Sequence, residues 1–550
     1  MSANIVCIVR ANAFLKADPK MRDERISEEE IQTSLLQEVE GTFGAGAASS
    51  RLKRLEMLLS PMYAALPKNE NGYLAHSTVR YALHRLFVQR HGWFINGLHD
   101  AGGYRNSTSS AGLLKEQVPA YVQELFEERL GGRGFGLHEL GVLAATIEHL
   151  VHNEAVKRLG ETFKVHQYLP TSILNESEAD EALDTYMVVY ILGEDLSNMT
   201  LEKAWELKAE MPDVFSAWDA TKQFVRDVRQ NISVSDASAD QQLSGGLDFS
   251  LIARTAERIG EQFGGFQNHE CDQIKASLVA REVGTTGRVL LSEFWRDDGN
   301  WQFQESMAYL KQLGVLDDSD SENPSVMIAN YINSPSNCIA SSKFYSVCCM
   351  DECESLMGNL EKQIVAPEAS AQRIAALVAD MSSSSVVAPR SLSESLLERL
   401  DEIAAVHSGQ VQLHGRLFAQ WMHHAFPREC PYPHVSGTIN SLTPDEWVEA
   451  TGQEEVVSDE EKASFFQRIP TARSFENETI SLPWTPEEEL LVVRVAPPVQ
   501  VGPSNTSVSP IRSVSLFAAM LGLAYGMMKA SVFTNRPDAC ANAKAEKFLV

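Results

Sequence analysis

A single apolar stretch near the carboxyl end, residues 514–533, constrains this 550-residue chain more than any other feature. It reads VSLFAAMLGLAYGMMKASVF, and roughly 20 apolar residues is the length that a helix needs to cross a bilayer. Lys529 interrupts the run near its end, where its long side chain can reach the polar interface. The sequence therefore predicts a single transmembrane helix, with a large region before it and a short tail at 534–550. The alternative is a buried helix of a soluble fold.

Small residues in this segment suggest that it also associates with a copy of itself. Gly522 and Gly526 are four residues apart, so they lie on one face of the predicted helix. Small residues at this spacing allow two membrane helices to approach closely. We therefore expect a homodimer through Gly522 and Gly526, although glycine is also common in such helices for other reasons.

The sequence gives two opposing indications of which side of the membrane the large region occupies. Basic residues are more numerous after the predicted span than directly before it, which favours a lumenal or extracellular location for the bulk of the chain. Six N-x-S/T sequons agree with that location. The N-terminus, however, lacks a convincing signal peptide, because Arg10 interrupts its short apolar run. The alternative is a tail-anchored protein with its bulk in the cytosol. The sequons begin at Asn106, Asn175, Asn198, Asn231, Asn477 and Asn505.

The charge of the chain excludes one class of partner. There are 74 Asp and Glu against 47 Lys and Arg, which gives a net charge of −27. An acidic surface of this kind repels phosphate backbones and favours cations, so we expect no nucleic-acid partner. Hydrophobic residues make up 44% of the chain, which is enough for sizeable cores.

The hydrophobic pattern predicts a mostly α fold. Apolar residues recur at helical spacing through most of the chain before residue 436, and Gly-rich or Ser-rich turns separate the helices. We expect helical domains built of helix–loop–helix units. Residues 41–50 are interpreted as a flexible break, residues 79–98 as helical, and Ser391 as a helix cap with Glu394. The expected organisation is a peripheral segment at 1–50, helical domains at 51–240 and 246–435, and an acidic, Pro-containing linker at 436–513.

The segment 281–295, REVGTTGRVLLSEFW, has the spacing of a calcium-binding loop. If Glu282 is the first loop residue, Gly287 is the sixth, where the turn requires a positive φ. Val289 is then the eighth residue, and Glu293 is the twelfth, where a carboxylate binds the ion with both oxygens. This segment resembles an EF-hand loop. The resemblance implies a helix on each side and a short β contact at the eighth residue.

The resemblance also implies a set of calcium ligands. These are the side chains of Glu282, Thr286 and Glu293 and the backbone carbonyl of Arg288. EF-hand loops usually carry Asp or Asn at the third and fifth residues, where this chain has Gly284 and Thr286. Calcium prefers six to eight oxygen ligands with several carboxylates, so we expect weak binding or none.

Two further segments resemble parts of the same pattern. In residues 67–78, Gly72 is at the sixth position and Leu74 at the eighth. EF-hand loops usually occur in pairs, and this segment is the first candidate for the partner loop. A third segment, RGFGLHEL, places Phe135 at the eighth position and Glu139 at the twelfth. The alternative for all three segments is an ordinary helix–turn–helix with a glycine at the helix end.

Five histidines and one cysteine lie between residues 407 and 434. Imidazole and thiolate are ligands that Zn and Cu prefer, so this block is a candidate metal site. A nucleophilic pair of Cys430 with His407 is a second possibility, and simple packing is the third. Four of the eight cysteines lie between residues 338 and 353, where disulfides and free buried thiols both fit the spacing. The histidines are His407, His414, His423, His424 and His434.

The sequence contains no catalytic motif, so an interaction role leads the functional hypotheses. The first hypothesis is a membrane-anchored interaction or scaffold protein, with an unknown protein partner and calcium dependence through Glu282 and Glu293. The second is a membrane-anchored metal-dependent enzyme that uses the block 407–434. The third is an adaptor without a small-molecule site.

Overall fold

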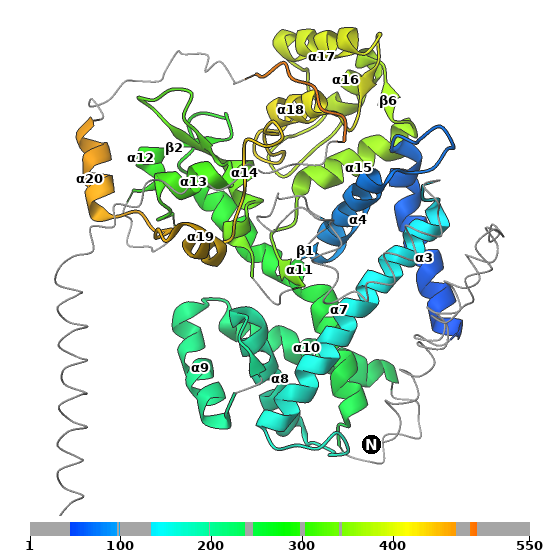
Figure 1. The fold of residues 1–550 in the computed structure, drawn as a ribbon, viewed down its shortest axis with the longest axis vertical. Coiled ribbons are helices and arrows are strands. Elements are labelled where there is room, and N and C mark those ends of the chain that lie inside the picture. Colours follow the sequence, from blue (N-terminus) through cyan, green and yellow to red (C-terminus); the bar gives the residue numbers. More distant parts are fainter. Residues whose placement is uncertain are drawn as a thin grey trace, which may run out of the picture. The chain divides into compact units, whose positions relative to one another are not determined.

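The computed structural model describes residues 45–95, 98, 134–196, 199–236, 246–296, 303–339, 344–468 and 484–491. Within these residues the chain is mostly helical, as the hydrophobic pattern predicts (Figure 1). No helix in these ranges is long and apolar enough to cross a membrane. The predicted transmembrane helix at 514–533, with Gly522 and Gly526, lies outside the described residues, as do most of 1–50 and all of 534–550.

The first hydrophobic core is formed by helices from the amino-terminal half of the chain and by one small sheet. Its helices begin with α3 and α4 and continue through α7 to α11. Strand β1 pairs with β5, which comes from much later in the sequence. The bounds are α3 Ala45–Ala65, α4 His76–His91, β1 Trp93–Ile95, α7 Leu137–Val165, α8 Glu176–Leu192, α9 Leu201–Val214, α10 Trp218–Asp236, α11 Phe249–Val279 and β5 Tyr345–Val347.

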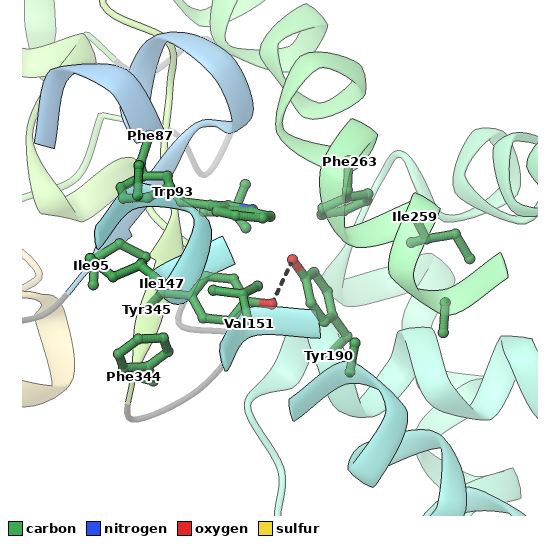
Figure 2. Packing of buried hydrophobic residues seen from close by; sticks show 14 of the residues in the cluster. Phe87, Trp93, Ile95, Ile147, Val151, Tyr190, Ile259, Phe263, Phe344 and Tyr345 are labelled. Atoms are coloured by element: carbon green, nitrogen blue, oxygen red, sulfur yellow. Dashed lines mark hydrogen bonds between the residues drawn. The ribbon is translucent and has the colours of Figure 1, made fainter. Parts of the chain in front are cut away.

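Aromatic side chains fill the centre of this core (Figure 2). Trp93 is fully buried, and its indole nitrogen donates a hydrogen bond to the backbone carbonyl of Gly260 at 3.2 Å. The hydroxyl of Tyr345 on β5 donates to the hydroxyl of Tyr190 on α8 at 3.4 Å. The ring of Tyr190 meets Phe263 edge to face, with 5.4 Å between centroids. Strand β5 is therefore integrated into a core that residues between Leu52 and Phe263 otherwise build, which is a long-range contact.

The second hydrophobic core surrounds a three-stranded antiparallel sheet with the strand order β2-β4-β3. The carboxyl-terminal half of α11 contributes to it through Leu278, so this helix is shared by two cores. The bounds are β2 Arg288–Leu290, α12 Leu291–Phe294, α13 Met307–Leu313, β3 Leu316–Asp317, β4 Ser325–Met327, α14 Ile328–Ile332, the 3-10 helix η3 Pro335–Asn337, α19 Pro444–Thr451 and α20 Asp459–Arg468.

The third hydrophobic core is formed by four helices and a two-stranded sheet of β6 with β7. Trp421 and Phe418 are fully buried in it and stack on each other. The bounds are α15 Glu352–Ile364, β6 Glu368–Ala369, α16 Ala371–Ala379, α17 Glu394–Val406, β7 Val411–Gln412 and α18 Arg416–Ala425.

Several local predictions need correction. Helix α3 begins at Ala45, inside the predicted flexible break, because its alanines are strong helix formers. The helical stretch predicted for 79–98 ends at His91, where Gly92 adopts a left-handed φ of 66° and turns the chain into β1.

Two further corrections concern the carboxyl-terminal half. The cap of α17 is Ser393 rather than Ser391, and its side chain accepts a hydrogen bond from the backbone nitrogen of Leu396. The predicted linker 436–513 contains α19 and α20. A capping box of Thr443 and Glu446 starts α19, and Trp447 anchors it in the second core.

Three disulfides cross-link the chain, and they use all four cysteines between 338 and 353. The alternative of free buried thiols is therefore wrong for these residues. Two of the bonds close long loops, of 78 and 77 residues. The pairs are Cys271–Cys349, Cys338–Cys348 and Cys353–Cys430.

Candidate functional site

The loop that resembles an EF-hand, residues 282–293, connects α11 to α12 and contains β2. Gly287 has a φ of +72°, which agrees with the turn that the sequence predicts at the sixth loop residue. Val289, the eighth residue, is fully buried and faces Val326 of β4 across an antiparallel contact. The loop therefore has a helix on each side and a short strand at the predicted residue.

The loop that pairs with 282–293 is not the one that the sequence suggested. Strand β4 follows the acidic segment Asp317 to Asn323 in the next helix–loop–helix, between α13 and α14. The first candidate, residues 67–78, instead pairs with the third segment. Leu74 and Phe135 exchange two backbone hydrogen bonds of 2.9 Å each. The spacing predicted the bridging residues but could not predict which loop meets which, because pairing depends on helix packing.

A third bridge of the same kind joins Leu174 to Leu247, through reciprocal backbone hydrogen bonds of 2.9 and 2.7 Å. No loop spacing in the sequence predicted this bridge. A signal is nevertheless present, because each leucine directly precedes the polar N-cap of a new helix. Asn175 forms a capping box with Glu178, and the side chain of Asp248 accepts from the backbone nitrogen of Leu251. A leucine followed by a polar helix cap thus marks the bridging position in both segments.

The four predicted calcium-ligand groups each have a partner within the protein. The Glu282 carboxylate accepts a hydrogen bond from the backbone nitrogen of Gly287 and pairs with the guanidinium of Arg428 at 2.6 Å. The hydroxyl of Thr286 donates to the carbonyl of Val283 at 2.9 Å. The Arg288 carbonyl accepts from the backbone nitrogen of Val283, also at 2.9 Å.

The twelfth loop residue has a separate partner. The Glu293 side chain is 41% exposed and pairs with Arg296, three residues later, at 2.8 Å. No group of three or more His, Cys, Asp or Glu side chains within the described ranges could hold a metal ion. The loop as arranged does not fit calcium, since both of its carboxylates are paired with guanidinium groups, Glu282 with Arg428 and Glu293 with Arg296. Calcium binding in solution stays a prediction.

The histidines of the block 407–434 have separate partners. The partner is a carboxylate for two of them, a backbone carbonyl for two and an aromatic ring for one. His407 bonds to Glu488, His414 to Glu361, His423 to the carbonyl of Cys430, His434 to the carbonyl of Gly314, and His424 stacks on Trp484. The disulfide with Cys353 consumes the thiol of Cys430. The predicted nucleophilic pair of Cys430 and His407 is therefore wrong.

A buried ionic cluster joins the first and third cores, and no sequence motif indicated it. The guanidinium of Arg85 on α4 is 1% exposed and pairs with Glu354 and Glu361 on α15. His414 donates to the same Glu361 carboxylate, at 2.8 Å. Burial raises the pKa of Glu354, and burial also lowers the pKa of His414. Burial raises the pKa of nearby Asp351 to about 7. One guanidinium thus serves several carboxylates, and the cluster links α4 to α15 as a structural ion-pair network.

A second network surrounds Glu148 and Glu261 in the first core. Arg51 donates to Glu148 at 2.8 Å, and His152 pairs with Glu261 at 3.2 Å. Burial alone would raise the pKa of Glu261, but the His152 hydrogen bond and charge outweigh it and lower the pKa to about 2. These contacts tie α3, α7 and α11 together, so His152 on α7 serves packing.

A scan against protein-family models, a search of curated proteins and a search of solved structures each found no match to this chain.

Proposed function

We propose that this chain is a membrane-tethered interaction protein whose helical region consists of EF-hand-like helix–loop–helix pairs. The observation that supports the proposal is the recurrent bridge between loops. Leu74 with Phe135, Leu174 with Leu247 and Val289 with Val326 each join two segments that directly precede helices, through antiparallel backbone contacts. In EF-hand proteins, the residue that makes this contact is the eighth of the loop.

Shared helices connect these pairs into a continuous array. Helix α7 follows the segment that contains Phe135 and precedes the loop that contains Leu174. Helix α11 likewise follows the segment that contains Leu247 and precedes the loop 282–293. Each pair buries its apolar faces against a neighbouring pair, which makes the array stable. Its exposed helix surfaces and loops are therefore held in fixed positions, where a partner protein can bind them. An acidic array of this kind suits a partner with a basic surface.

The disulfides support a lumenal or extracellular location for this region. Disulfides persist in oxidising compartments and are rare in the cytosol. Two of the six sequons fall on described residues, and both asparagines, Asn175 and Asn231, are exposed.

If the region is lumenal or extracellular, removal of N-glycans by a glycosidase should lower the mass of the protein isolated from cells. The variants Asn175→Asp and Asn231→Asp should each reduce that change by one glycan. No change of mass for the wild-type protein would favour the tail-anchored alternative.

The interaction role is tested with the full chain at its natural abundance. The protein, tagged and extracted from membranes in a mild detergent, should elute as a complex that contains a second polypeptide in fixed stoichiometry. High salt should weaken the complex if charge contributes to recognition. Light scattering that gives only the mass of the chain itself, as a monomer or homodimer without a second component, would contradict the proposal.

A further inference from the structure

We propose that the guanidinium of Arg428 is the built-in cation of the loop 282–293 and takes the place of a calcium ion. Arg428 lies in the segment after α18, 146 residues from its partner Glu282. Its Nε and Nη2 atoms both donate to the same Glu282 oxygen, at 2.8 and 2.6 Å. The Glu282 side chain is 1% exposed, so its charge needs a cation close by.

The loop is shaped to receive this segment. A Cβ atom on Gly287 would lie 2.3 Å from the carbonyl oxygen of Pro427 and 2.7 Å from its carbonyl carbon. The glycine therefore has two roles at once. It allows the left-handed turn, and it leaves room for the backbone that carries Arg428.

The segment that carries Arg428 is itself held in place. Cys430 is bonded to Cys353 at the start of α15, and its backbone nitrogen donates to the carbonyl of Phe426 at 2.8 Å. Glu429 is buried and accepts hydrogen bonds from the hydroxyls of Ser383 and Ser385. Arg428 is thus delivered to the loop by a fixed backbone, and little conformational entropy is lost when the ion pair forms.

The guanidinium of Arg428 differs from a calcium ion in its charge and in the number of oxygen ligands that it needs. A guanidinium has one positive charge and directional N–H donors, which match a single carboxylate. Calcium requires several more oxygens and a second carboxylate, but Glu293 faces Arg296. The result is a loop that keeps the helix–strand–helix geometry without a metal and is locked to the third core. This inference rests on the loop contacts and not on the proposed interaction role.

Thermal unfolding of the full chain in detergent tests the inference, with 10 mM CaCl2 or MgCl2 in parallel. We expect Arg428→Met to lower the midpoint by several degrees, because a buried carboxylate loses its partner. Glu282→Gln should also lower it, and the double variant should lose less than the sum of the two. Glu293→Gln is the matched control within the loop and should change the midpoint by less than about 1 °C.

Calcium supplies the second arm of the test. The unfolding midpoint of the wild-type protein should shift no more in calcium than in magnesium. Calorimetric titration with calcium should give the same heat for the wild-type protein and for Glu282→Gln, because Glu282 binds no calcium. The inference is overturned if the wild-type protein gives a calcium heat that Glu282→Gln lacks, or if Arg428→Met unfolds within 1 °C of wild type. If Arg428→Met does not fold, Arg428→Lys keeps the charge but not the paired donors and should be intermediate in stability. The calcium measurement on the wild-type protein remains decisive in that case.

Discussion

Single buried charges connect parts of this chain that are distant in sequence. Arg85 on α4 pairs with two carboxylates of α15, and Arg428 after α18 pairs with Glu282 of the loop 282–293. In each pair at least one of the two side chains is only 1% exposed. The desolvation of such groups means that the pairs add less stability than their distances suggest. Removal of one partner is nevertheless costly, because the other charge remains buried. We therefore expect their main effect to be on which segments pack together.

Replacement of Arg85 tests this at one residue. Arg85→Met leaves the Glu354 and Glu361 carboxylates without their cation, so the free energy of unfolding should fall by about 3–5 kcal/mol. Denaturant titration measures the change. The control is Lys203→Met, since Lys203 pairs with Glu206 while both are more than half exposed, and it should cost less than about 0.5 kcal/mol. Equal effects of the two substitutions would show that the buried cluster has no special weight.

His423 makes the stability depend on pH in a defined direction. It is fully buried, and burial lowers its pKa to about 3. The unfolded chain binds a proton at this histidine below about pH 6.5, whereas the folded chain does not, so stability falls as the pH decreases from 6.5 towards 3.

The variant His423→Asn isolates this effect. Asparagine can keep the donor to the carbonyl of Cys430 but does not titrate. The difference in unfolding free energy between wild type and variant should change by about 1.4 kcal/mol per pH unit between pH 6 and 4, in favour of the variant at lower pH. Parallel curves for the two proteins would show that His423 is protonated in the folded state.

At the scale of elements, the long helices are the frame of the fold. Helix α11 spans 31 residues. It packs in the first core through Phe263 and in the second core through Leu278. It passes close to the end of α4, where a Cβ atom on Gly264 would lie 1.9 Å from the carbonyl oxygen of His91. The two helices can approach only because residue 264 has no side chain.

The two neighbouring glycines of α11 give a matched prediction. Gly264→Ala forces α11 away from the backbone of His91 and should reduce stability by about 1–3 kcal/mol or more. Gly265→Ala meets nothing within 4 Å and should raise stability by about 0.5–1 kcal/mol through helix propensity. Thermal unfolding of the two variants provides the measurement. A stabilised Gly264→Ala protein would mean that the helices are further apart than described here.

At the scale of the molecule, two disulfides cross-link distant parts of the chain within single cores, one in the second core and one in the third. Cys271–Cys349 ties the middle of α11 to the segment before α15, and Cys353–Cys430 ties α15 to the segment after α18. Loops of 78 and 77 residues restrict the unfolded chain strongly, so each bond should contribute roughly 4 kcal/mol.

Reduction should therefore lower the unfolding midpoint markedly, and Cys353→Ser with Cys430→Ser should reproduce part of the loss.

Peptide mapping without reduction should find the linkages Cys271–Cys349, Cys338–Cys348 and Cys353–Cys430. The adjacent residues Cys348 and Cys349 make this a strict test. A linkage in which they exchange partners would contradict the fold around β5.

The sequence by itself determined the helical class, because apolar residues at helical spacing must be buried on one face of each helix. It also determined the local geometry of the loop at Gly287 and the bridging residues Leu74, Phe135 and Val289, since turn chemistry is local. It could not determine which loops pair, because that depends on how distant helices pack.

Only the tertiary structure decided the chemistry of the candidate site. The sequence placed Glu282 where a calcium ligand belongs, with Arg281 and Arg288 as the nearest basic residues. In the structure, Arg281 donates to backbone carbonyls of α12 and Arg288 pairs with Asp317. The structure brings Arg428 to that carboxylate from 146 residues away, and it separates the histidines of 407–434 among five different partners. Charge pairing over such separations is decided by packing, so a local pattern of ligands can predict a loop's shape without predicting what the loop binds.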